Sequence, residues 1–315
     1  MKTSKSFLVV LLLAAAAAAI ASEANDRDSG LRFTNVSFMD AALWRADTVA
    51  DHRIRYDSDS RGIPQFGDLR LPDGPAPEAG FPVIVFIHGG AWRAQWTKDY
   101  TEPLVERLVP EGFATWDLEF RRMGNRRGGY PGTFEDVADG LDHVRELADE
   151  YPLDVDHVIA MGHSSGGHLA LWLAGRHHLS ESSPLHRDNP LPLRGVISIA
   201  GVNDLELALT LGGRTDVLEL ADVDDLASGR DRLGEVDPGR LLPLGVPLVQ
   251  VIGDRDSKWR LDMHQRFEAR TRDAGDPVRT LIVPGANHMD IVDGESGMAP
   301  VLAGIARELL STSPE

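Results

Sequence analysis

The sequence has no cysteine among its 315 residues. It therefore forms no disulfide, offers no cysteine nucleophile and supplies no thiolate ligand to a metal ion. The metal-binding pattern H-E-x-x-H and the phosphate-binding pattern G-x-G-x-x-G are also missing from it. We therefore expect a protein that works without a metal or other cofactor and whose stability comes from a packed apolar core, which a chain of this length can bury.

Positive charge is scarce as well. The 32 Lys and Arg residues are outnumbered by 49 Asp and Glu residues, and the formal net charge is −17. Nucleic acid is not expected as a partner, because its binding depends on neutralising phosphates with Lys and Arg. An anionic membrane surface would repel the chain for the same reason, so the acidity mainly favours solubility.

A long apolar run occurs only at the start of the sequence, over residues 7–21. It follows Lys2 and Lys5 and ends in A-I-A, which is the pattern of a secretory signal peptide. The alternative is an uncleaved membrane anchor, but a run of about 15 residues is short for a span. We therefore expect a secreted or periplasmic protein with a signal peptide at 1–21, a flexible leader at 22–30 and one folded domain at 31–315.

From residue 81 onward, apolar runs rich in β-branched residues alternate with segments of helical apolar spacing. Strands are expected at 81–87, 112–120, 157–162, 195–200, 247–253 and 278–283. Helices are expected at 98–109, 131–151, 165–176, 259–274 and 298–310. This alternation predicts an α/β fold with a doubly wound, mostly parallel sheet that is covered by helices on both faces.

Two regions fall outside the alternation. Short β-like runs precede it at 35–39, 52–56 and 66–71. Within it, residues 203–244 are rich in leucine, acidic residues and glycine but show no clear period. A stretch this long inside a compact domain is typical of a functional insert, so we interpret it as a cap over a site, with a peripheral helical decoration as the alternative.

The turn after the predicted strand 157–162 reads Gly162-His163-Ser164-Ser165-Gly166 and leads into a helix. This fits the G-x-S-x-G motif, in which a sharp strand-to-helix turn exposes one serine hydroxyl at the edge of the sheet. Centring the motif on Ser165 would lose the first glycine, so Ser164 is the candidate nucleophile. The alternative is a purely structural turn, in which small residues let a strand pack closely against a helix.

A serine hydroxyl needs a base, and the base needs a carboxylate that orients it. Strand 278–283 leads into a loop that holds His288, the candidate base, whereas His264 falls in a predicted helix. Strand 247–253 leads into a loop with two aspartates, Asp254 and Asp256. Their position in the sequence alone does not decide which of the two is the carboxylate that orients the base.

The first buried strand leads into Gly89, Gly90, Ala91 and Trp92. Glycines let the backbone turn its N–H groups toward a bound group, as an oxyanion hole requires. We therefore expect donors from Gly89, Gly90 or Ala91 to act together with the backbone N–H of Ser165. Several tryptophans lie near strand ends, and Trp92 is the best candidate for a pocket wall, although tryptophans are also common in cores.

Four ordered motifs, HGGAW (88–92), GHSSGGH (162–168), GDRDSKW (253–259) and GANHMD (285–290), resemble the α/β-hydrolase superfamily. The likeness is greatest to esterase/lipase-like members with an HGG-type oxyanion loop, such as feruloyl-esterase-like enzymes and kynurenine formamidases. The resemblance implies Ser164 as nucleophile, His288 as base and Asp256, three residues after Gly253, as acid. The third glycine of the HGGG form is Ala91 here.

These residues predict a serine hydrolase that cleaves carboxylic esters of small molecules through an acyl-enzyme intermediate. An amide hydrolase, either an arylformamidase or a small-peptide hydrolase, is the first alternative. A non-catalytic binding protein on the same fold is the second, although such proteins usually lose the serine or the histidine, and this chain has both.

Overall fold

The computed structural model describes residues 30–57 and 64–312. The predicted signal peptide at 1–21 and nearly all of the predicted leader lie outside these residues. Within the described part of the chain, no helix combines the length and the apolar character needed to cross a membrane.

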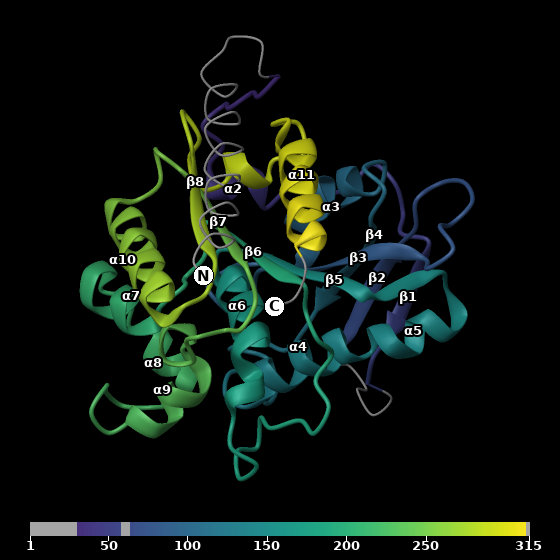
Figure 1. The fold of residues 1–315 in the computed structure, drawn as a ribbon. Helices are drawn as coiled ribbons and strands as arrows, with labels where there is room; N and C mark the ends of the chain where they lie inside the picture. The colour runs from purple at the N-terminus through teal and green to yellow at the C-terminus, as the bar shows by residue number, and fades with distance from the viewer. Residues whose placement is uncertain (1–29, 58–63, 313–315) are drawn as a thin grey trace, which may run out of the picture.

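One eight-stranded sheet forms the centre of the fold, in the order β1-β2-β4-β3-β5-β6-β7-β8 (Figure 1). The two pairings that involve β2 are antiparallel, and the six strands from β4 to β8 in this order pair in parallel. The predicted doubly wound, mostly parallel sheet is thereby confirmed. The strands are β1 (His52–Arg55), β2 (Phe66–Arg70), β3 (Phe81–Ile87), β4 (Ala114–Glu119), β5 (Leu153–His163), β6 (Gly195–Ile199), β7 (Leu248–Gly253) and β8 (Val278–Val283).

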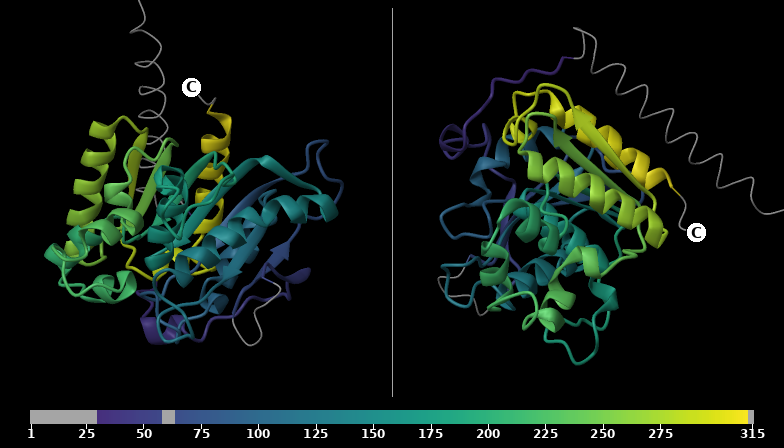
Figure 2. Two further views of the ribbon diagram at one scale, coloured as in Figure 1. Left: turned by 90° about the horizontal axis from the view of Figure 1, so that it is seen from below. Right: turned by 90° about the vertical axis from the view of Figure 1, so that its left-hand side faces the viewer.

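Helices cover both faces of the sheet, as the two views in Figure 2 also show. Strand β3 contributes to both layers: Val83, Val85 and Ile87 pack into one apolar cluster, and Ile84 and Phe86 into the other. The helices are α2 (Phe38–Ala41), α3 (Glu102–Leu108), α4 (Gly132–Asp142), α5 (Val144–Glu150), α6 (Ser165–Gly175), α7 (Leu205–Gly212), α8 (Asp216–Ala221), α9 (Arg230–Val236), α10 (Lys258–Ala274) and α11 (Met298–Ser311). Short 3-10 turns are η1 (Lys98–Tyr100), η2 (Arg176–His178), η3 (Pro238–Arg240) and η4 (Asp290–Val292).

Two sequence-based predictions of local structure need correction. The run 35–39 is not a strand, because the Ser37 hydroxyl accepts a hydrogen bond from the Asp40 N–H at 3.1 Å and caps helix α2. The single helix predicted at 131–151 is interrupted at His143, where α4 ends and α5 begins. The insert 203–244 folds into the three short helices α7, α8 and α9 and the turn η3, and segments this short show no long helical period.

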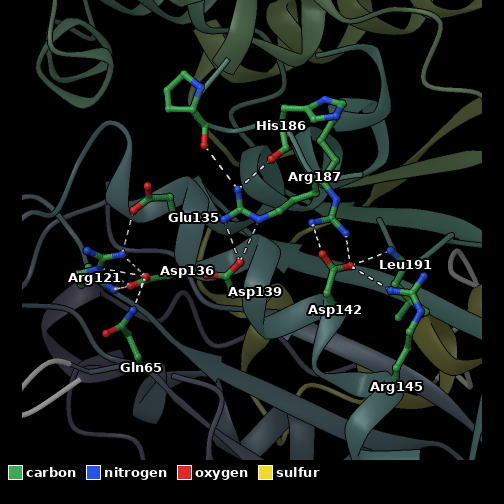
Figure 3. A network of polar contacts seen from close by, with 12 residues as sticks. Gln65, Arg121, Glu135, Asp136, Asp139, Asp142, Arg145, His186, Arg187 and Leu191 are labelled. Carbon is green, nitrogen blue, oxygen red and sulfur yellow. Dashed lines mark hydrogen bonds and ion pairs between the residues drawn. The ribbon is translucent and has the colours of Figure 1, made fainter. Parts of the chain in front are cut away.

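The acidic face of α4 binds arginines from other parts of the chain (Figure 3). Asp136, Asp139 and Asp142 stand three residues apart and therefore share one side of the helix. Their partners are Arg121 after β4, Arg187 in the loop before β6 and Arg176 in η2. These ion pairs hold α4 and the 179–194 loop at the side of the sheet. The three α4 carboxylates are therefore engaged in structural contacts.

The N-terminal segment lies beside the C-terminal part of the chain, where α2 approaches η4 (Figure 1). The Val36 N–H donates to Asp290 Oδ1 at 3.0 Å, and the Val36 carbonyl accepts from Asn287 Nδ2 at 3.0 Å. Arg255 Nη1 donates to Asn35 Oδ1 at 2.8 Å. These bonds place α2 next to the loop that carries His288.

Candidate active site

Ser164 stands at the turn between β5 and α6 with φ 55° and ψ −119°, a backbone conformation that few side chains tolerate. Its N–H donates to the Ile199 carbonyl at 2.8 Å, which ties the turn to β6. The flanking glycines are required for steric reasons. A Cβ on Gly162 would lie 2.2 Å from the Gly166 carbonyl oxygen, and one on Gly166 would lie 2.0 Å from that of Ile87.

Asp256 and His288 form a hydrogen-bonded pair, in which Asp256 Oδ2 lies 2.7 Å from His288 Nδ1. The other carboxylate oxygen accepts from the Ser257 N–H at 2.6 Å and from Arg260 Nη1 at 3.1 Å. Burial alone would raise the pKa of Asp256, but His288 and Arg260 together hold this pKa below its ordinary value. An ionised Asp256 accepts a hydrogen bond from the Nδ1–H of His288. The proton of the neutral ring therefore stays on Nδ1, and Nε2 presents a lone pair.

Asp254, the rival acid, does not contact His288. Its side chain is exposed, and its Oδ1 accepts a hydrogen bond from the Gly285 N–H at 2.8 Å. Asp254 therefore holds the turn after β8, and the structure brings Asp256 to the base.

His288 Nε2 is buried and makes no hydrogen bond within the described residues, and His288 shares a cavity with Ser164. Burial lowers the pKa of His288 below 6.5, and the positive charge of Arg260 lowers it further. The ring is thus neutral near pH 7 and able to take a proton. Catalytic hydrogen bonds of this kind often close only when substrate binds.

The loop after β3 provides backbone donors beside Ser164. Gly90 and Ala91 both have positive φ, 110° and 55°. No hydrogen bond in the described part of the chain uses the N–H of Gly90, Ala91 or Ser165. The N–H of Gly89 is different, because it donates to the Tyr100 oxygen at 2.8 Å. Among the candidate donors Gly89 is thus engaged, and the N–H groups of Gly90, Ala91 and Ser165 have no partner within the described residues; their role as oxyanion donors stays a prediction.

Trp92 is placed differently from the predicted pocket wall. Its side chain is buried, and its Nε1 donates to Nδ1 of His168 at 3.2 Å, behind the oxyanion loop. Its backbone N–H donates to the Ser165 hydroxyl at 3.2 Å. The backbone of Trp92 has a positive φ of 55°. Trp96, four residues later, lines the cavity instead.

A buried chain of hydrogen bonds connects the oxyanion loop to the loop of the base. Tyr100, which accepts from Gly89, lies with its hydroxyl 2.7 Å from His163 Nδ1. His163 Nε2 lies 3.1 Å from the carbonyl oxygen of His288, which can only accept. Since Nε2 must therefore carry the proton, the Tyr100 hydroxyl donates to Nδ1. Burial, with His288 nearby, keeps the pKa of His163 well below 6.5, so this ring is neutral. Sequence reasoning missed Tyr100.

The cavity above Ser164 is small, with a volume of about 140 Å³. A cavity of about 150 Å³ holds a benzene ring, so this one suits small groups. Phe38 of α2 lies on one wall, and its ring centroid is 5.5 Å from that of His288. Arg214, from the insert, and Arg260, from α10, also line it.

Comparisons with known proteins find similarity in sequence and fold to named esterases. A family model described as BD-FAE matches residues 68–217. The chain is 28% identical over 238 residues to "Esterase LipC" of Mycobacterium tuberculosis, covering 71% of this chain and 56% of LipC. It is 32% identical over 101 residues to "Esterase LipQ" of the same organism, covering 32% of this chain and 23% of LipQ.

Solved structures extend the likeness to most of the chain. Esterase B from Lactobacillus rhamnosis superposes with a TM-score of 0.68 at 18% identity, over 98% of this chain and 96% of that one. A truncated carbohydrate esterase from gut microbiota superposes with a TM-score of 0.66 at 18% identity, over 85% of this chain and all of that one.

The parallel sheet, the serine at the turn after β5 and these superpositions define the α/β-hydrolase fold. Over parts of its length the chain is also similar in sequence to the BD-FAE family model and to LipC and LipQ, which are named as esterases. The chain spans 56% of the length of LipC and 23% of the length of LipQ.

Proposed function

We propose that this protein is a serine esterase that hydrolyses carboxylic esters of small molecules through an acyl-enzyme intermediate. One arrangement carries the proposal: the Asp256–His288 pair leaves Nε2 unpartnered at a cavity that also holds Ser164 and the free N–H groups of Gly90 and Ala91. The esterase names of LipC and LipQ support it.

In the first half-reaction, the Ser164 oxygen adds to the ester carbonyl carbon while its proton passes to Nε2 of His288. The carbonyl oxygen becomes an oxyanion, which accepts hydrogen bonds from the backbone N–H groups of the 90–91 loop and of Ser165. When the carbon–oxygen bond to the alcohol breaks, the imidazolium returns its proton to the departing alcohol. Asp256 stabilises the imidazolium in between.

In the second half-reaction, water replaces the alcohol. Its proton passes to Nε2, its oxygen adds to the acyl carbon, and collapse of the new tetrahedral intermediate releases the acid and restores the Ser164 hydroxyl. The same steps cleave an amide, and the human acylamino-acid-releasing enzyme is 25% identical over 233 residues, covering 70% of this chain and 30% of that enzyme. The small cavity favours short esters as the first substrates to test.

The two adjacent serines offer a matched test. Ser164→Ala removes the nucleophile and is expected to lower kcat for p-nitrophenyl acetate by about 10⁴-fold or more. Ser165→Ala keeps the backbone N–H and removes only a hydroxyl that accepts from Trp92, so it should cost no more than about tenfold. A fluorophosphonate probe should label the peptide that contains Ser164 in wild type and not in Ser164→Ala. Full activity of a folded Ser164→Ala protein overturns the proposal.

The location of the protein is a separate part of the proposal. The charged start, the apolar run and the A-I-A end of residues 1–21 support export with cleavage near Ala21. Expression of the full chain in a secreting host, followed by intact-mass measurement, should find a protein that begins near Ser22 outside the cytoplasm. A full-length mass in the membrane fraction would support the anchor instead.

A further inference from the structure

Two arginines line the cavity of Ser164, and no carboxylate does among the described residues that form its wall. The charged side chains that line it are therefore the two arginines, Arg214 and Arg260, which stand beside Ser164 and the neutral ring of His288. A wall of this kind is unusual for a chain whose formal net charge is −17.

Both guanidinium groups are held in place from behind. Arg214 Nε donates to Asp216 Oδ1 at 2.9 Å, and Arg260 Nη1 donates to Asp256 Oδ1 at 3.1 Å. Both also pack on the ring of Trp259, with centroid distances of 5.6 Å and 4.5 Å. Fixed in this way, the two charges lose little side-chain entropy when a ligand binds.

The arginines retain capacity for a further partner. Arg260 has a side chain that is only 11% exposed, its Nη1 contacts Asp256 and Ser257, and no hydrogen bond within the described residues uses its Nη2. Asp216 and Asp256 contact the guanidinium groups but do not line the cavity. Both arginines line the same cavity as His288 and Ser164, and their positive charges lower the pKa of the His288 ring.

We propose that Arg214 and Arg260 form a subsite for a carboxylate carried by the substrate, so that the preferred ester is a small anionic one. The proposal rests on the proposed esterase function and adds its substrate class. Asp216 occupies Nε and Nη2 of Arg214, and Asp256 occupies Nη1 of Arg260, so a substrate carboxylate would accept hydrogen bonds from the remaining guanidinium N–H groups. Because both arginines line the same small cavity as Ser164, we expect the carboxylate to lie close to the scissile ester. This role also gives the insert a function, since it supplies Arg214.

The preference for an anionic ester must arise from short-range contacts between the substrate and the protein. An acidic protein repels anions at long range, so any selection of an anionic ester must come from the two guanidinium groups inside the cavity. Charge-assisted hydrogen bonds are the strong ones in proteins, and losing the partner of a buried charge is costly. We therefore expect the effect on kcat/KM to reach about tenfold or more for one arginine.

The test compares anionic esters with neutral esters of the same shape. Monomethyl succinate and methyl 4-oxopentanoate place the difference on the acyl side, and O-acetylglycolate and 2-acetoxyacetamide place it on the alcohol side. Wild-type kcat/KM is expected to favour the anionic member of at least one pair by about tenfold or more at low salt. Because Arg214 lines the cavity, the readout for Arg214→Gln is the ratio of kcat/KM for the anionic member to that for the neutral member, and this ratio should fall toward one.

Arg232→Gln is the matched control. Arg232 belongs to the same insert, pairs with Asp222 and packs on the ring of Tyr130 at 4.6 Å, but it does not line the cavity. This variant should keep the preference. Because Arg260 also contacts Asp256, the readout for Arg260→Gln is the ratio of the two kcat/KM values, which should fall toward one.

The outcomes separate this inference from the proposed function. Equal kcat/KM for both members of both pairs overturns the carboxylate subsite and leaves the esterase intact. A preference that survives in both Arg214→Gln and Arg260→Gln also overturns it. If wild type hydrolyses neither these esters nor p-nitrophenyl acetate, the proposed function itself fails. Succinate or glycolate should inhibit wild type and not Arg214→Gln, which checks binding without turnover.

Discussion

The Tyr100 hydroxyl lies 2.7 Å from Nδ1 of His163, and this hydrogen bond joins the oxyanion loop to the loop that carries His288. The two loops leave different strands, β3 and β8, and must hold their spacing for the chemistry to occur. Tyr100 and His163 are therefore positioning residues, and they act through Gly89 and His288.

Tyr100→Phe tests this connection. It leaves the Gly89 N–H and His163 Nδ1 buried without partners, at about 1–3 kcal/mol for each group, so both Tm and kcat should fall. Tyr56→Phe is the control, because its hydroxyl donates to the Glu119 carbonyl at 2.8 Å and is not part of the chain that joins the two loops. We expect Tyr56→Phe to lower Tm with little change in kcat, and Tyr100→Phe to lower kcat by about tenfold or more. Equal kcat in the two variants would contradict a positioning role.

The two aspartates after β7 should differ sharply. Asp256→Asn removes the charge that orients and stabilises the ring of His288, and a loss of about 10⁴-fold in kcat is expected. Asp254→Asn changes an exposed side chain that holds a turn, so kcat should stay within about twofold. The kcat values of both variants are compared by steady-state kinetics on p-nitrophenyl acetate, and circular dichroism checks that both are folded. The reverse order of effects would make Asp254 the acid.

The pH dependence follows from the lowered pKa of His288. The neutral ring is the working base, so kcat/KM should fall on the acid side with a midpoint below pH 6.5. Arg214→Gln removes a positive charge that disfavours the imidazolium, so the pKa should rise and the midpoint should move to higher pH. The profile is measured with a neutral ester at constant ionic strength. A midpoint above 7 in wild type, or a downward move in the variant, would count against this electrostatic account.

Two glycines should respond in opposite ways to alanine. In Gly166→Ala the new Cβ would lie 2.0 Å from the Ile87 carbonyl oxygen, so the turn cannot keep its shape, and the protein should lose activity and several kcal/mol of stability. Gly304 lies exposed in helix α11 with no atom within 4 Å of the new Cβ. Gly304→Ala should therefore raise the unfolding free energy by about 0.5–1 kcal/mol. Urea titrations of both variants provide the comparison.

Much of the fold was predictable because its signals are local. Buried parallel strands read as short apolar runs, and the sharp turn at Ser164 requires glycines at fixed positions, so β3, β5 and the turn could be located from the sequence. The order of Ser164, Asp256 and His288 along the chain also pointed to the residues that the structure brings to one edge of the sheet.

The remaining features depend on contacts between distant positions. Nothing in the sequence around Tyr100 shows that its hydroxyl meets His163, 63 positions later. Trp92 is buried and its Nε1 donates to His168, 76 positions later, a contact that the residue type does not reveal. Residues 35–39 alternate like a strand, but the Ser37 cap and the docking of Val36 against Asp290 favour a helix there. Tertiary packing decided each of these cases.

The docking of Val36 onto Asn287 and Asp290 joins positions 251 and 254 residues apart, and it seats Phe38 beside His288. The pocket wall is thus completed by opposite ends of the described chain. Under the proposed function, a polypeptide that ends before His288 lacks the base, so we expect it to be inactive. Because both ends of the described chain contribute to this wall, ester turnover during refolding should return only after they have docked.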